Sequence, residues 1–197
     1  MNRADRKRWA SARTLADLAE LTALWLEGEI GKAPGYDGGP APETVDLVPV
    51  LAAANRAGFI TIGSQPGLLS EYSDQRAAVE GFAAPETLDR LRSALHVKID
   101  DSGLLLIVQA REAPWRMSWA RAVPVTTAYG APFTRFGTAL SRRFIRDSWQ
   151  GYGICHRTVT RALCEARQVT IVDRDWGRND RLWPALQEFA EQEASTP

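Results

Sequence analysis

Residues 43–64, ETVDLVPVLAAANRAGFITIGS, constrain the fold most, because they join a helix directly to a β-strand. The helix opens on a Glu-Thr pair and ends at Asn-Arg-Ala-Gly (55–58), where glycine suits the position after the last turn. The strand that follows, residues 59–64, alternates apolar and small polar residues. Thr61 and Ser64 are expected on one face of this strand, beside the start of the helix. The unit therefore predicts a cradle for a small ligand.

The sequence also predicts the buried face of this helix, an irregular start and a turn-rich loop before it. A buried stripe is expected along the helix, comprising Val45, Leu47, Val48 and Leu51. Pro49 predicts a kink or an irregular first turn. The preceding loop, residues 32–42, is rich in glycine and proline, and its Tyr36 either closes over a ligand or pins the loop to the core.

Hydrophobic periodicity predicts the remaining elements and an α+β fold. Helices are expected over residues 14–28, 85–95 and 181–193, and in part over 140–167 with an interruption at 151–153. Strands are expected over residues 75–83, 97–100, 104–110, 122–127 and 169–172. Residues 104–110 are almost wholly apolar, which predicts a central strand covered on both faces. Since the order is not a strict βαβ alternation, a mixed β-sheet core flanked by helices is preferred over a doubly wound sheet.

Length and composition favour one packed domain. The chain has 197 residues, 45% of them hydrophobic, and its seven tryptophans supply ample material for a core. One domain is expected over residues 14–193. A basic, solvated tail is expected at residues 1–13, and a short C-terminal tail at 194–197.

Charge and cysteine usage exclude several classes of function. Lys+Arg and Asp+Glu both total 24, so no net field favours nucleic acid or an anionic membrane as a partner. No apolar run approaches the ~20 residues of a membrane span, and no signal peptide is recognisable. The two cysteines have no metal-ligand spacing with another pair, so a reduced, cytoplasmic protein without a metal site or cofactor is expected.

No catalytic set stands out. The P-loop, G-x-G-x-x-G, H-E-x-x-H and G-x-S-x-G motifs are missing from the sequence. Cys155 and His156 are adjacent and would point ~100° apart on a helix, which makes a nucleophile–base pair weak, and His96 is remote in sequence. The Asp-Arg-Asp run at 173–175 is interpreted as structural, and the arginines within 142–146 as a solvated helix face.

Several ordered motifs resemble one known family. The residues PET (42–44) and LAAANRAGFITIGSQP (51–66) are similar to the C-terminal regulatory domain of eukaryotic methylenetetrahydrofolate reductase. That domain has Glu-Thr, a helix ending in an Asn-Arg/His-x-Gly element, and then Leu-Thr-Ile-Asn-Ser-Gln-Pro. Residues 75–82 resemble its Gln-Lys-Ala-Tyr-Leu-Glu-Phe-Phe, and the segments VTIVDRDW and LW near the end resemble its Val-Asn-Leu-Val-Asp-Asn-Asp-Phe and Leu-Trp. The matches span residues 40–189, with a poorly matching middle at 95–167.

This resemblance implies a ligand. In that family the regulatory domain binds S-adenosylmethionine, the allosteric inhibitor, or S-adenosylhomocysteine, which competes with it. The implied ligand-binding residues are Glu43, Thr44, Thr61, Ser64, Thr126 and Thr138, with Thr127 or Thr134 as alternatives to the last. A carboxylate can pair with the ammonium or sulfonium charge, while hydroxyls and helix-terminal N–H groups can bond the ligand carboxylate and ribose. Alternatively, Thr44 is only a helix cap, and Thr61 and Ser64 are only strand residues.

Two departures from the family bear on function. The flavin-bearing reductase barrel has no counterpart in these 197 residues, and Gly63 stands where the family has asparagine. The leading hypothesis is therefore a stand-alone, non-catalytic binding module for a small nucleoside ligand, acting as a sensor or sequesterer with or without a protein partner. The alternatives are an enzyme acting on such a nucleotide through Glu43, Asp173 or His156, and an interaction protein with a vestigial pocket.

Overall fold

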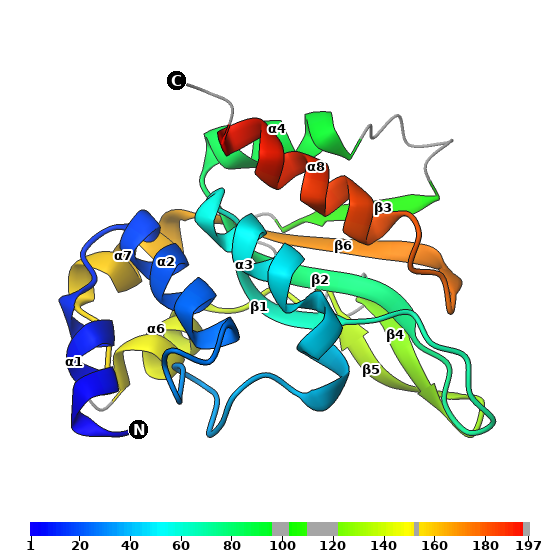
Figure 1. The fold of residues 1–197 in the computed structure, drawn as a ribbon, viewed down its shortest axis with the longest axis horizontal. Helices are drawn as coiled ribbons and strands as arrows, with labels where there is room; N and C mark the ends of the chain where they lie inside the picture. The colour runs from blue at the N-terminus through cyan, green and yellow to red at the C-terminus, as the bar shows by residue number, and fades with distance from the viewer. Residues whose placement is uncertain (96–102, 110–121, 152–153, 195–197) are drawn as a thin grey trace.

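The computed structural model describes residues 1–95, 103–109, 122–151 and 154–194, and it confirms the α+β class (Figure 1). The strands are β1 (Ile60–Gln65), β2 (Arg76–Ala83), β3 (Leu104–Val108), β4 (Val123–Ala128), β5 (Ala131–Phe136) and β6 (Arg167–Trp176). The helices are α1 (Arg3–Ser11), α2 (Leu15–Leu26), the 3₁₀ helix η1 (Pro42–Leu47), α3 (Val48–Arg56), α4 (Pro85–Ala94), α6 (Arg142–Gln150), α7 (Arg157–Glu165) and α8 (Leu182–Ala194).

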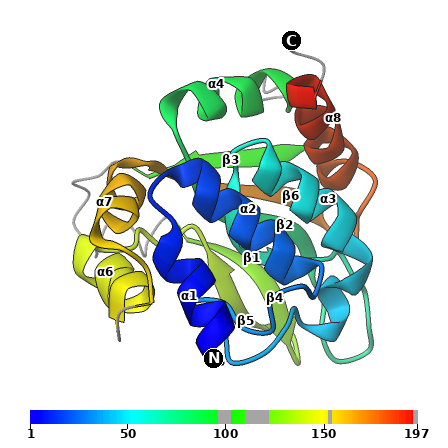
Figure 2. The ribbon, with the colours of Figure 1, turned by 60° about the vertical axis from the view of Figure 1, so that its left-hand side comes forward.

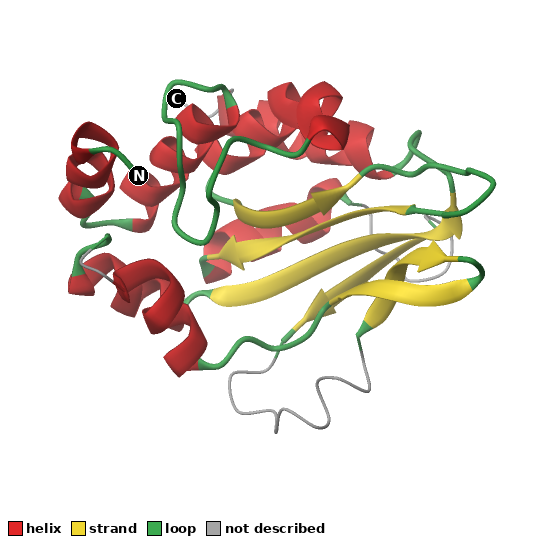
Figure 3. Ribbon diagram, turned by 90° about the horizontal axis from the view of Figure 1, so that it is seen from below, coloured by secondary structure: helices red, strands yellow, loops and turns green. Residues whose placement is uncertain are grey.

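The main sheet has four strands in the order β1-β2-β6-β3, and β4 and β5 form a separate hairpin. Every described pairing is antiparallel, so the expected mixed sheet is an antiparallel one. The helices α2, α3, α4 and α8 gather along one face of this sheet (Figures 1 and 3). The β4–β5 hairpin lies against β2 on the other face.

Covering both faces explains the composition of the central strands. Successive side chains of a strand point to opposite faces. On β2, Val79 belongs to the large core beneath the helices and its neighbour Ala78 packs against the hairpin. On β6, Ile171 belongs to the large core and its neighbour Val172 packs against the hairpin. Most side chains of both strands are therefore buried, whichever face they point to.

The strand predicted at the centre lies at an edge. Residues 104–110 were expected to be covered on both faces, but β3 pairs only with β6, and most of its side chains are half-buried. The interior strands are β2 and β6, and β6 is longer than the predicted 169–172. Apolar composition cannot distinguish the two positions, because a partly covered edge strand carries similar residues. The strand predicted at 97–100 lies outside the described residues, and β5 was not predicted.

The first residues form a packed helix, so the predicted tail at 1–13 is wrong. Asn2 caps α1 by accepting a hydrogen bond from the Asp5 amide at 2.7 Å. Trp9 is fully buried, and its indole N–H donates to the Lys32 carbonyl at 2.9 Å. Figure 2 shows α1 lying beside α6, where Trp9 meets Trp149 edge to face at 6.5 Å. The basic residues of α1 masked this apolar anchor in the sequence.

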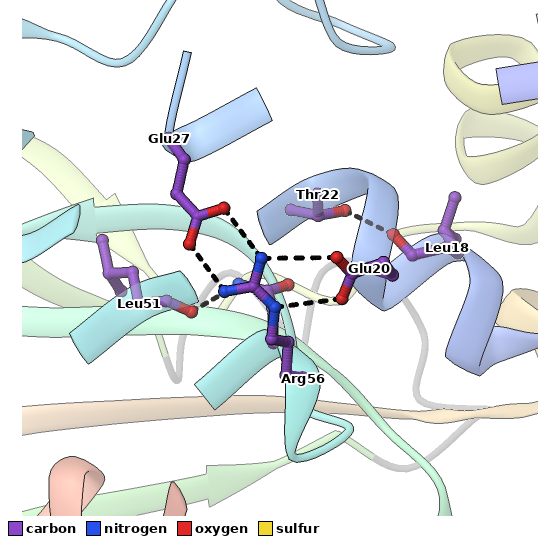
Figure 4. A network of polar contacts seen from close by, with 7 residues as sticks. Leu18, Glu20, Thr22, Glu27, Leu51 and Arg56 are labelled. Carbon is purple, nitrogen blue, oxygen red and sulfur yellow. Dashed lines mark hydrogen bonds and ion pairs between the residues drawn. The ribbon is translucent and has the colours of Figure 1, made fainter. Parts of the chain in front are cut away.

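An ion-pair network joins α2 to α3 (Figure 4). The Arg56 guanidinium lies 3.0 Å from the Glu20 carboxylate and 2.6 Å from that of Glu27. Thr14 caps the other end of α2 in a reciprocal capping box with Asp17. Local sequence therefore defines the start of this helix, as predicted, and Arg56 holds its end against α3.

The segment before α3 begins irregularly, as Pro49 predicted. Residues 42–47 form the 3₁₀ helix η1, and α3 begins only at Val48. Of the predicted apolar stripe, Leu47 and Leu51 are buried, but Val45 is 59% exposed. The tighter 3₁₀ winding changes the direction of side chains relative to an α-helix, which puts Val45 outside. At the other end, Gly58 has a φ of +96°, which requires glycine and ends the helix as expected.

Candidate functional site

A cavity of about 190 Å³ lies between the start of η1, β1 and the loop before η1; we call it the Thr61 cavity. Three of the predicted ligand residues, Thr44, Thr61 and Ser64, line it together. The rest of its wall comes from Trp25, Leu26, Tyr36, Pro40, Ala41, Leu51, Ile62, Gly63, Gln65 and Phe136. The helix–strand unit therefore lines a cavity at the place of the predicted cradle, and ligand binding there stays a prediction.

A β-bulge lets Thr61 and Ser64 share this cavity. Residues three apart on a regular strand point to opposite faces. In β1, Thr61 pairs with Gly81 and Gly63 pairs with Glu80, so Ile62 is an extra residue without a partner. The bulge shifts the alternation by one residue and directs both hydroxyls to one side. Sequence alone predicted the shared face but not the irregularity that produces it.

A buried asparagine orients Thr61. The Asn55 side chain is fully buried, and its amide nitrogen donates to the Leu51 carbonyl and to the Thr61 hydroxyl oxygen, both at 2.8 Å. Its amide oxygen accepts from the Thr61 backbone N–H at 3.1 Å. Because the Thr61 oxygen already accepts a hydrogen bond, its own proton remains available as a donor to a ligand.

Three other polar groups on the cavity wall have capacity left for a ligand. The Gln65 side-chain nitrogen is buried and has no hydrogen-bond partner among the described residues. The hydroxyls of Thr44 and Ser64 likewise make no side-chain hydrogen bond within the described part of the chain. A buried donor without a partner costs free energy, so the Gln65 nitrogen indicates a missing partner such as a ligand or water, whereas the two hydroxyls are simply free to bond one. Gln65 was not singled out in the sequence, although it directly follows the predicted strand.

The loop before η1 covers the cavity. The Tyr36 ring packs on Trp25 at a centroid distance of 4.8 Å, and its hydroxyl donates to the carbonyl of Ile62, the extra residue of the bulge. The Trp25 indole N–H in turn donates to the Gly38 carbonyl at 3.0 Å. Tyr36 therefore pins the loop to the core, and it also forms part of the cavity wall; closure over a ligand stays a prediction.

Gly63 is explained by crowding. A Cβ added at this position would lie 3.3 Å from the Phe136 ring and 3.5 Å from the Glu80 side chain. Phe136 lies on β5, whose hairpin reaches the cavity from the other face of the sheet. An asparagine at this position would therefore require the Phe136 ring to shift by a few tenths of an ångström.

A second cavity, of about 260 Å³, adjoins the first and shares Trp25, Tyr36, Thr61 and Ile62 with it; we call it the Glu80 cavity. Small-ligand pockets usually measure about 300–1,000 Å³. Each cavity alone is below that range. The four shared wall residues place the two cavities side by side, so a ligand larger than either would have to extend from one into the other.

The other predicted site residues lie elsewhere. Glu43 is exposed at the start of η1 and does not line either cavity. The Thr126 hydroxyl is buried in the β4–β5 hairpin, where it accepts from the Thr134 amide at 2.9 Å. The alternative Thr127 accepts from the Asp74 amide at 3.1 Å, and the Thr138 carbonyl accepts from the Gln168 side chain. None of these threonines lines either cavity. In addition, the N-cap of η1 is Ala41, so Thr44 is not the cap.

The residues considered for catalysis are engaged in the fold. Burial raises the pKa of the Cys155 thiol to about 12. The His156 ring accepts from the Thr158 amide at 3.2 Å and caps α7. Asp173 is fully buried and forms an ion pair with Arg178 at 2.7 Å, as the structural interpretation of this run predicted. None of the three is oriented as an acid or base toward the Thr61 cavity.

A wider surface groove of about 720 Å³ runs between α6 and α7. Four exposed arginines line it, namely Arg142, Arg146, Arg157 and Arg161. The first two confirm the solvated face predicted for this helix. The buried polar atoms that lack a partner in the described ranges belong to Gln65, Gln75 and Arg76, none of which lines the groove. The Thr61 cavity is therefore the stronger candidate for a ligand.

Neither a metal centre nor a membrane segment emerges from the described residues. No group of three or more His, Cys, Asp or Glu side chains there is placed to hold a metal ion. Within the same ranges, no helix combines the length and the apolar character needed to cross a membrane.

These features define an antiparallel α+β domain with a two-part cavity at one edge of its sheet. Residues 4–192 match the family described as "Domain of unknown function (DUF6919)", and the chain belongs to this family. The chain is also similar to methylenetetrahydrofolate reductase (NADH) 1 of Zea mays, with 31% identity over 99 residues, which cover 42% of this chain and 17% of that protein. Methylenetetrahydrofolate reductase 1 of Schizosaccharomyces pombe is 28% identical over 133 residues, which cover 56% of this chain and 22% of the reductase.

The local similarity to eukaryotic methylenetetrahydrofolate reductases that the motifs indicated is therefore confirmed. The chain spans less than a quarter of the length of either reductase.

Proposed function

We propose that this domain is a non-catalytic binding module for S-adenosylmethionine, S-adenosylhomocysteine or a related adenosine metabolite, acting as a sensor or sequesterer. The observation that carries the proposal is the set of unpaired polar groups around the Thr61 cavity, above all the buried Gln65 amide nitrogen. The similarity to two methylenetetrahydrofolate reductases supports it. The stretch at 51–66, which resembles the regulatory domain of that family, supplies most of the cavity's polar wall.

The chemistry of the wall suits an adenosine-type ligand. Hydroxyl groups both donate and accept hydrogen bonds, so Thr44, Thr61 and Ser64 can bond ribose hydroxyls or ring nitrogens. The Gln65 amide can donate to a ligand carboxylate or a ring nitrogen. The apolar part of the wall, which includes Trp25 and Phe136, can cover the faces of an adenine ring. We therefore expect one ligand molecule to use both kinds of surface.

Calorimetric titration with S-adenosylmethionine and with S-adenosylhomocysteine tests the proposal. Each lost hydroxyl should remove roughly 0.5–1.5 kcal/mol of binding free energy, so Thr61→Val combined with Ser64→Ala should weaken binding about tenfold or more. Ser93→Ala removes an exposed hydroxyl on α4 and serves as the matched control. No heat and no thermal shift with either compound would overturn the proposal.

Two further measurements separate the alternatives. Chromatography of the bound ligand after incubation should recover it unchanged, whereas a product would favour the enzyme hypothesis. Glu43→Ala, titrated alone, determines whether that exposed carboxylate takes part. Because Glu43 does not line the cavity, we expect a smaller loss than for Thr61→Val. An equal or larger loss would place the ligand at the cavity mouth.

A further inference from the structure

The Glu80 cavity combines aromatic rings with one carboxylate. Its wall includes Trp9, Trp25, Tyr36 and Trp149, which come from α1, α2, the loop before η1 and α6. Trp25 and Tyr36 stack at 4.8 Å, and Trp9 meets Trp149 edge to face at 6.5 Å. Three consecutive N-terminal segments and the distant helix α6 thus surround one small space with aromatic faces and edges.

Glu80 is the one acidic residue on this wall within the described residues. It projects from β2, and its Oε2 accepts from the Gly137 amide at 3.0 Å and from the Thr170 hydroxyl at 3.4 Å. No Lys, Arg or His among the described residues pairs with it, and its Oε1 accepts no hydrogen bond from them. Burial raises the pKa of Glu80, because no neighbouring cation compensates the lost hydration.

This combination is the chemistry of a site for an organic cation. Aromatic faces attract cations through the negative face of the ring, and they favour weakly hydrated ones such as quaternary ammonium groups. A small, strongly hydrated ammonium loses more hydration free energy when it leaves water. A carboxylate without a cationic partner beside such rings gains most from a cation that sheds its water easily. A trialkylsulfonium is such a cation.

We propose that the Glu80 cavity holds the sulfonium centre of the ligand, with Glu80 as the counter-charge and Trp25 and Tyr36 as its aromatic wall. This inference rests on the proposed function for the identity of the ligand. It makes Glu80, rather than the exposed Glu43, the residue that distinguishes S-adenosylmethionine from S-adenosylhomocysteine. Those two compounds share every other functional group, so the ratio of their affinities reports the sulfonium alone.

The ratio of the two dissociation constants, measured by calorimetry at neutral pH, is the direct test. The wild-type protein should prefer S-adenosylmethionine by roughly tenfold. Glu80→Gln keeps an oxygen that can accept the bonds from Gly137 and Thr170, and it should reduce the ratio severalfold without weakening S-adenosylhomocysteine, because only the aromatic wall then favours the sulfonium. The control Glu71→Gln removes an exposed carboxylate from the loop between β1 and β2 and should leave the ratio unchanged. A ratio that is equal in the wild type and Glu80→Gln would overturn the inference.

Lowering the pH tests the charge of Glu80 in the wild-type protein. This measurement does not depend on whether Glu80→Gln folds well. The pKa of Glu80 is raised, so its negative charge and the preference for the sulfonium should be lost as the pH falls through that pKa. Tyr36 is the other titratable group on the described wall, and its pKa is also raised, so it stays neutral throughout. A ratio that does not change over this range would contradict the role of Glu80.

Trimethylsulfonium, observed by saturation-transfer NMR, separates this inference from the proposed function. It should bind the wild type and Glu71→Gln severalfold more tightly than Glu80→Gln. If neither adenosyl compound binds while trimethylsulfonium still discriminates between the variants, the cation site stands and the proposed function falls. If trimethylsulfonium binds the wild type and Glu80→Gln equally, or binds neither, the cation site is wrong.

Discussion

Replacing Asn55 by alanine tests how the site is built into the fold. The Asn55 side chain makes three buried hydrogen bonds, to the Leu51 carbonyl, the Thr61 hydroxyl and the Thr61 amide. At a net value of about 0.5–1.5 kcal/mol each, their loss should cost about 3 kcal/mol. For a chain of this size, that corresponds to a fall of roughly 6–12 °C in the unfolding midpoint.

The coupling between Asn55 and Thr61 sharpens this prediction. Thr61→Val removes one of the three bonds and should cost about 1 kcal/mol by itself. Since the two residues share that bond, the double variant should lose about 1 kcal/mol less than the sum of the single losses. The assay is urea unfolding of the wild type, both single variants and the double variant, with circular dichroism as the probe.

The control for these variants is Gln187→Ala. Gln187→Ala removes an exposed amide on α8, and it should change the free energy of unfolding by less than about 0.5 kcal/mol. If Asn55→Ala costs no more than this control, or if the losses at Asn55 and Thr61 simply add, the buried network does not hold the Thr61 hydroxyl in place.

Three further predictions follow from other contacts. Arg178→Met leaves the fully buried Asp173 without its ion-pair partner and should cost about 3–5 kcal/mol in urea unfolding; a loss below 1 kcal/mol would contradict this. Cys155 should resist alkylation of the native protein, because burial raises its pKa to about 12, whereas the less buried Cys164 should react first in a mass-spectrometric time course. Hydrogen bonds from its arginine partner lower the pKa of Glu27 below 4.5, so its contribution to stability is present above that value and lost as the pH falls through the folded-state pKa. Glu27→Gln should therefore flatten the acid limb of a plot of unfolding midpoint against pH, and an unchanged limb would refute the assignment.

Features defined by neighbouring residues could be predicted from the sequence. Thr14 as the cap of α2, Gly58 as the end of α3 and Pro49 as the cause of an irregular start all act within one turn of chain. The apolar stripe of α8, with Leu186 and Phe189 inward, follows from a helical period over a long segment. Periodicity and capping are local properties, so composition and spacing are sufficient for them.

Features that depend on distant partners could not be predicted. The basic helix α1 is anchored by Trp9, whose partners lie at Lys32 and Trp149. Whether an apolar strand such as β3 is central or at an edge depends on which strands pair with it. The order of the strands along the chain does not determine these pairings. The hairpin strand β5 follows a Tyr-Gly turn in which both residues have positive φ, and it carries few buried side chains to mark it.

The candidate site divides in the same way. The sequence by itself identified the helix–strand unit at 43–64 and the hydroxyls of Thr61 and Ser64 within it. Only the tertiary structure decided that a bulge at Ile62 turns both hydroxyls inward, that Gln65 joins them without a partner among the described residues, and that Glu80 lies next to them. The physical reason is that a strand's neighbours, rather than its own residues, set its register and decide which polar groups are left to bind a ligand.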